Sequence, residues 1–190
     1  MMRLELQFFG GRGSSGGNNP LGKSEVTVSD LSKASKEWSR THEYGTKATT
    51  KEKAAAEKNR DALNQAFTEQ AKTDAGKISI LKNMKAGANE EAVFSYKNSK
   101  NESDNVFVYK VDKNTYRIRF PMHKDATYEG TASQVVRQIN KLTAGKQYTK
   151  AAASAFGSPT KNVPVSYSRD PKTGKTKEVL HPEKIRKLKG

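Results

Sequence analysis

The three histidines are the first side chains to consider as acid–base groups. His42, His123 and His181 are scattered along the chain, each in a polar segment. His123 lies near Asp125 and Glu129, which hints at an acid–histidine pair, but no nucleophile is matched to them. The sequence has no HExxH, and its Gly-rich stretch at residues 10–22 lacks a preceding strand, so this stretch is expected to be a linker and not a phosphate cradle. We therefore expect a protein that is not an enzyme and has neither cofactor nor metal, with a small packaged nuclease or toxin as an alternative.

Charge gives a stronger indication than the histidines do. Lys and Arg number 35 against 20 Asp and Glu, a net charge of +15. Residues 1–95 hold 15 basic and 12 acidic side chains (+3), and residues 96–190 hold 20 and 8 (+12). A surplus of this size indicates an anionic partner that meets the second half, although a merely soluble basic protein remains an alternative.

One candidate interface is a pair of neighbouring strands that carry basic and aromatic side chains. A positive sheet face with interleaved aromatic rings can contact phosphates and stack on bases. The alternative is an ordinary solvated sheet face, since one face of an antiparallel sheet normally carries Lys and Arg. The candidate nucleic-acid-binding residues here are Tyr109, Lys110, Tyr116, Arg117 and Arg119.

A second candidate interface is the basic run near residue 190. It contains Lys184, Arg186 and Lys187, followed by Lys189. Such runs bind polyanions without reading their sequence. The alternative is a solvated, disordered end.

Helix signals precede residue 88. A first helix is expected to begin at Ser29 or Asp30 and to run through Trp38. A second should follow Thr50, rich in Ala, Lys, Glu and Gln, with Lys53 leaving its capping box incomplete. A short third helix is expected around Ile78, Leu81 and Met84.

Strand signals dominate the next region. The pattern predicts strands at residues 92–96, 105–111 and 115–120, with a turn at 112–114. Thr131 is then expected to cap a helix, whose apolar face contains Val135, Val136, Ile139 and Leu142. Further on, residues 151–156 suggest a helical turn, and residues 163–168 and 175–180 suggest a hairpin. The expected fold class is α+β: N-terminal helices, then a small antiparallel sheet with one packed helix, and flexible termini. The expected regions are a removable or flexible segment (1–24), a helical region (25–88), a small α+β module (89–146) and a basic C-terminal extension (147–190).

Residues 4–11, LELQFFGG, form the most specific motif. It resembles the N-terminal motif of capsid and scaffold proteins from phages of Gram-positive bacteria, over about residues 4–13. That resemblance implies cutting by a host cysteine protease after the paired phenylalanines, with Leu4, Leu6, Gln7, Phe8, Phe9 and Gly10 as the cleavage motif. A protease can recognise an extended peptide through pockets that accept its alternate side chains. The alternative is an N-terminal edge strand that docks on the body.

Together these signals predict a phage virion-associated or head-assembly accessory protein that binds nucleic acid through its C-terminal half. Its expected partners are nucleic acid, phage head proteins and the host processing protease. Its expected location is the virion or the host bacterial cytoplasm. No apolar run approaches the roughly 18 residues of a membrane span, so no membrane is expected. An injected or prophage-encoded effector that inhibits a host protein or defence system is the main alternative.

Overall fold

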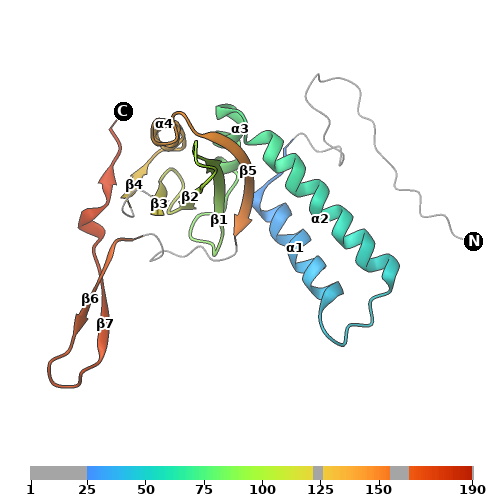
Figure 1. Ribbon diagram of the computed structural model, residues 1–190, viewed down its shortest axis with the longest axis horizontal. Helices are drawn as coiled ribbons and strands as arrows, with labels where there is room; N and C mark the ends of the chain where they lie inside the picture. Colours follow the sequence, from blue (N-terminus) through green and yellow to red (C-terminus); the bar gives the residue numbers. More distant parts are fainter. Residues whose placement is uncertain (1–24, 122–125, 155–162, 190) are drawn as a thin grey trace, which may run out of the picture.

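The computed structural model describes residues 25–121, 126–154 and 163–189. These residues form an α+β fold, as the sequence predicted (Figure 1). The main elements, in chain order, are α1 (Val28–His42), α2 (Thr50–Gln70), α3 (Asp74–Lys82), β1 (Glu91–Lys97), β2 (Ser103–Lys110), β3 (Tyr116–Phe120), β4 (Ala126–Gly130), α4 (Ala132–Leu142), β5 (Gln147–Ser154), β6 (Val165–Arg169), β7 (Thr176–Leu180), η2 (Pro182–Lys184) and β8 (Arg186–Lys187).

The N-termini of α1 and α2 lie slightly earlier than expected. Thr27, rather than Ser29 or Asp30, caps α1. Thr49 caps α2, and its side chain and backbone exchange hydrogen bonds with Glu52, so the capping box is complete. A cap residue keeps an extended backbone while its hydroxyl accepts from the third helical N–H, which fixes where each helix begins.

The sheet has six strands in the order β5-β1-β2-β3-β4-β8. All neighbours pair antiparallel except β8, which runs parallel to β4. The sheet is therefore mixed, not purely antiparallel as expected. Residues 151–154 belong to β5 and form no helical turn. Since β5 and β8 both come from residues 147–190, this region completes the sheet of the expected 89–146 module.

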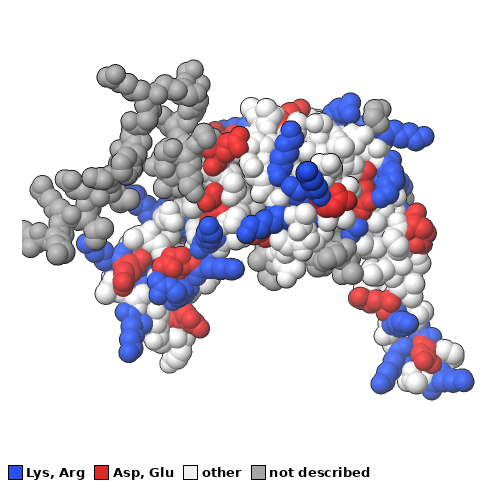
Figure 2. Space-filling model, turned by 180° about the vertical axis from the view of Figure 1, so that it is seen from behind, with Lys and Arg blue, Asp and Glu red and all other residues white. Residues whose placement is uncertain are grey.

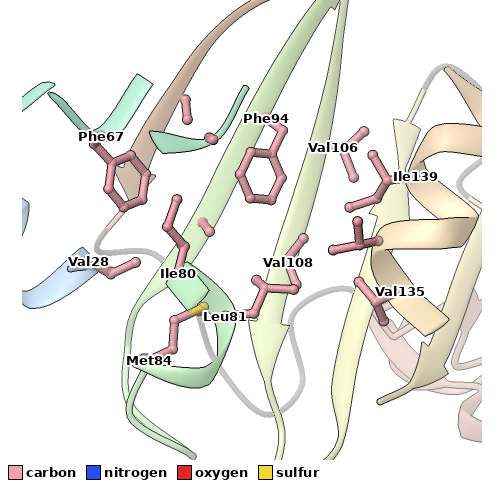
Figure 3. Close-up of a cluster of buried hydrophobic side chains, with 14 of the residues drawn as sticks. Val28, Phe67, Ile80, Leu81, Met84, Phe94, Val106, Val108, Val135 and Ile139 are labelled. Atoms are coloured by element: carbon pink, nitrogen blue, oxygen red, sulfur yellow. The ribbon is translucent and has the colours of Figure 1, made fainter. Parts of the chain in front are cut away.

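One hydrophobic core joins the helices to one face of this sheet (Figure 3). Phe94, Val106 and Val108 project from the sheet toward α3 and α4. Val135, Val136 and Ile139 supply the apolar face of α4, as the sequence predicted, and Thr131 caps that helix. Side chains from α1 and α2 belong to the same cluster, so the helical region and the sheet share a core.

Strands β6 and β7 form a separate hairpin that projects from the body (Figure 1). The sequence predicted this hairpin and its Asp-Pro-x-x-Gly turn. The Asp170 carboxylate accepts the backbone N–H groups of Lys172 and Thr173, and Gly174 has a φ of 68°, which a residue without Cβ adopts most readily. A local turn network therefore shapes the tip of the arm.

Candidate nucleic-acid interface

The basic and aromatic residues of β2 and β3 do not form one exposed face. Lys110 pairs with Tyr116, and both lie on the face that packs against the helices, together with Val108. Tyr109 pairs with Arg117 on the opposite face. Successive side chains of a strand alternate between faces, so Lys110 and Arg117 lie on opposite faces. The prediction of a single positive face is therefore wrong.

Lys110 has a structural partner. Its ammonium donates to the carbonyl oxygens of Lys82 at 2.7 Å and Met84 at 2.9 Å, at the C-terminal end of α3. The residue is only 8% exposed, and burial lowers the pKa of its ammonium. The Nζ atom also lies 5.4 Å from the centre of the Tyr116 ring. Lys110 thus satisfies helix-end carbonyls that have no partner within the helix.

Arg117 belongs to a row of side chains that crosses the other face of the sheet. The register places Glu91, Tyr109, Arg117, Glu129 and Lys187 side by side on five successive strands. Arg117 Nε lies 2.7 Å from Glu129 Oε1, and Lys187 pairs with the other oxygen of the same carboxylate. Burial raises the pKa of Glu129, but the hydrogen bonds from Lys187 and Arg117 outweigh it and leave the pKa below its ordinary value.

Arg119 is partly buried on the same face as Arg117. Its guanidinium carbon lies 5.3 Å from the centre of the Phe107 ring, within the range of a cation–π contact. The register places Thr127 of β4 beside it. Arg119 thus lies between the aromatic ring of Phe107 and the polar side chain of Thr127 on neighbouring strands.

The backbone of the basic run near residue 190 is anchored to the sheet as far as Leu188. Arg186 pairs with Tyr128 in the parallel register, and its guanidinium donates to the Tyr128 hydroxyl. Ile185 is buried, and Leu188 donates its N–H to the Glu129 carbonyl oxygen. Lys184, Arg186 and Lys187 all keep exposed side chains, although the ammonium of Lys187 is paired with Glu129.

The projecting hairpin is the most open basic element among the described residues. Figure 2 shows its blue side chains standing clear of the body. Four basic residues lie on it, against the acidic residues Asp170 and Glu178. The basic residues are Arg169, Lys172, Lys175 and Lys177, all exposed. Tyr167 is 66% exposed on the same arm, so a basic ribbon here carries an accessible aromatic ring.

The sequence predicted this hairpin and the surplus charge of residues 96–190, but the predicted binding residues lie on β2, on β3 and in the basic run near residue 190. The missed signal was the spacing of Arg169, Lys172, Lys175 and Lys177 around a turn. Val165 and Tyr167 alternate with Ser166 and Ser168, but both apolar side chains are exposed, so the arm has no buried face. Strands β2 and β3 also alternate, and they bury the charged side chains of Lys110 and Arg117.

No family model, curated protein or solved structure significantly matches the chain. Residues 25–121, 126–154 and 163–189 contain no cluster of His, Asp and Glu that could hold a metal ion. None of the helices in these ranges is long and apolar enough to cross a membrane. The LELQFFGG motif and His123 lie outside the described residues.

Proposed function

We propose that the protein binds nucleic acid through the hairpin β6–β7, used as a basic β-ribbon arm. The observation that carries the proposal is the exposure of four basic side chains on an arm that projects from the body. By contrast, Lys110 and Arg117 are held by partners within the fold. On the arm, Arg169 Nε donates to the neutral Gly174 carbonyl oxygen at 3.2 Å, which leaves its positive charge available for an external anion.

The dimensions of the arm suit a nucleic-acid groove. Each strand has five residues, which corresponds to about 17 Å at the usual rise of a strand. The major groove of B-DNA is about 12 Å wide and admits a two-stranded ribbon. The tip and both strands can therefore contact phosphates along the groove walls while the body stays outside.

The strength of binding should depend on salt. Arg169, Lys172, Lys175 and Lys177 are the candidate phosphate contacts, so four counterions would be released. The expected slope of log K against log salt is then about −3.5 on duplex DNA. Because phosphate contacts carry no sequence information, we propose binding without strong sequence preference.

Charge reversal tests the assignment. The Lys172→Glu/Lys175→Glu variant should weaken binding at least about tenfold more than Lys33→Glu/Lys36→Glu, a control with the same change in net charge on α1. Lys33 and Lys36 are also exposed, so neither variant should disturb the core. Equal losses in both variants would assign binding to net charge alone. Absence of wild-type binding near physiological salt would overturn the proposal.

We also propose that this binding serves a phage head. The support is the resemblance of residues 4–11 to the processed N-termini of phage capsid and scaffold proteins. A packaged basic protein would meet nucleic acid at high local concentration, where modest affinity without sequence preference suffices. Identification of the protein in purified virions by mass spectrometry tests this setting.

A further inference from the structure

Three side chains at the base of the hairpin form a hydrogen-bonded relay. Ser166 Oγ lies 2.6 Å from His181 Nε2, and His181 Nδ1 lies 2.7 Å from Glu183 Oε1. Ser166 is on β6, His181 directly follows β7, and Glu183 is in η2. The backbone N–H of His181 donates to the Pro164 carbonyl oxygen at 2.7 Å, which holds the histidine at the base of the arm. Strand β6 and the turn that follows β7 thus meet at one imidazole ring.

The order of the contacts assigns a role to each atom. The pKa of Glu183 lies below its ordinary value, because its own backbone N–H and the His181 side chain both donate to the carboxylate. An ionised carboxylate only accepts, so the proton of a neutral imidazole is on Nδ1 and Nε2 is left to accept from the Ser166 hydroxyl. A hydroxyl on a base that a third group orients is the general arrangement of an activated nucleophile.

The relay is open to a substrate. Ser166 is partly exposed, and 21% of the His181 side chain is accessible. On the face of the ribbon that carries Ser166, the next residue pair consists of Ser168 and Lys177. The site therefore has an accessible nucleophile, a base and an orienting carboxylate.

We propose that Ser166, His181 and Glu183 form a nucleophilic site that hydrolyses small carboxylic esters. Ser166 Oγ bonds to the ester carbonyl carbon while its proton passes to His181 Nε2. The carbon–oxygen bond to the leaving group then breaks, and the departing alcohol takes that proton. Water attacks the resulting acyl-serine and gives a proton to Nε2, which returns it to Ser166 as the carboxylic acid leaves. The net reaction converts ester and water into acid and alcohol.

This site is independent of nucleic-acid binding, and the two proposals can fail separately. The full chain is treated with a fluorophosphonate probe, and the modified residue is located by peptide mass spectrometry. We expect modification at Ser166 but not at Ser168, which lies two residues further along the same face and serves as the internal control. Turnover of p-nitrophenyl acetate should show the same dependence on Ser166.

Variants separate chemistry from structure. Ser166→Ala should abolish labelling and ester turnover, and Ser168→Ala should leave both unchanged. His181→Gln should slow both by about 100-fold, a typical effect of losing a general base. Circular dichroism and DNA titration of each variant report whether the hairpin persists. Equal labelling of Ser166 and Ser168, absence of labelling at Ser166, or labelling without ester turnover would overturn the proposal and leave the relay as a clamp of the hairpin base.

Discussion

Arg117 and Glu129 form a buried ion pair across β3 and β4, with Nε and Oε1 2.7 Å apart. The two residues are 8% and 5% exposed. Lys187 adds a second cation to the same carboxylate from β8. The pair thus connects three strands of one sheet edge, and its charge is used inside the fold and not toward an external anion.

Replacing Arg117 with Met should destabilise the protein by about 3 kcal/mol, because the Glu129 carboxylate then stays buried with one cation fewer. Urea denaturation measures the loss. The double variant Arg117→Met/Glu129→Leu should recover much of it, since no buried charge is left without its partner. A double variant less stable than the single one would contradict this account.

Stability should fall in acid partly through Glu129. Its pKa in the folded state is below the ordinary value of 4.5, so its contribution is complete above that pH and is lost as the pH falls through the lower, folded-state value. Glu129→Gln should be less stable near neutral pH and should lose less stability on acidification. Denaturation midpoints of both proteins between neutral pH and about pH 3 provide the measurement. Parallel pH curves would show that the carboxylate does not contribute.

Lys110→Met should cost about 1–3 kcal/mol, because the carbonyl oxygens of Lys82 and Met84 lose a charged donor in a buried setting. The affinity for DNA and its salt slope should stay unchanged. Paired denaturation and DNA titrations distinguish the two roles. A reduced salt slope at unchanged stability would show that Lys110 contacts nucleic acid and not the helix-end carbonyl groups.

Ile139→Asp should unfold the shared core. Ile139 is fully buried on α4, and an unpaired carboxylate there costs on the order of 3 kcal/mol or more. Ile139→Val, which removes one methylene, should cost only about 1 kcal/mol and serves as the control. Hydrogen exchange on the wild type should show the strongest protection within residues 92–145. Stronger protection of residues 50–75 would contradict the expected order.

Protein isolated from phage particles should begin at Gly10. This follows from the LELQFF–GG pattern and the glycine-rich segment behind it, and removal of residues 1–9 leaves the net charge unchanged because Arg3 and Glu5 cancel. Intact-mass measurement decides the matter. A mass that corresponds to a start at Met1 or Met2 would contradict processing.

Much of the fold could be predicted because β-branched and aromatic residues alternate strongly in β1, β2 and β3, and a Thr-Ala-x-Gln sequence begins α4. The short strand β4 was missed because ATYEG offers little apolar alternation. β5 was missed because its centre, Ala151–Ala153, has weak strand propensity and gains its place by pairing with β1. Strand β8 has two residues and forms by pairing with β4, so no local sequence pattern predicts it.

Less of the candidate site than of the fold could be predicted from the sequence. Period-two alternation within β2 already places Lys110 on the face of Val106 and Val108, so its burial could have been predicted. The pairing of Arg117 with Glu129 depends on a strand that the sequence did not reveal. The relay of Ser166, His181 and Glu183 requires the register of β6 on β7, which a turn motif alone does not fix.

The short connection between the arm and β8 has a mechanical consequence. Only residues 181–185 separate the end of β7 from the start of β8, and β8 is held to the sheet by two residue pairs. Of the two sheet strands that flank the arm in the chain, β5 forms seven residue pairs with β1 and β8 only two with β4, so tension on a nucleic-acid-bound arm would break the β8 pairing more easily. The strand is therefore positioned as the first element to peel away under load, while the five-stranded remainder keeps its core.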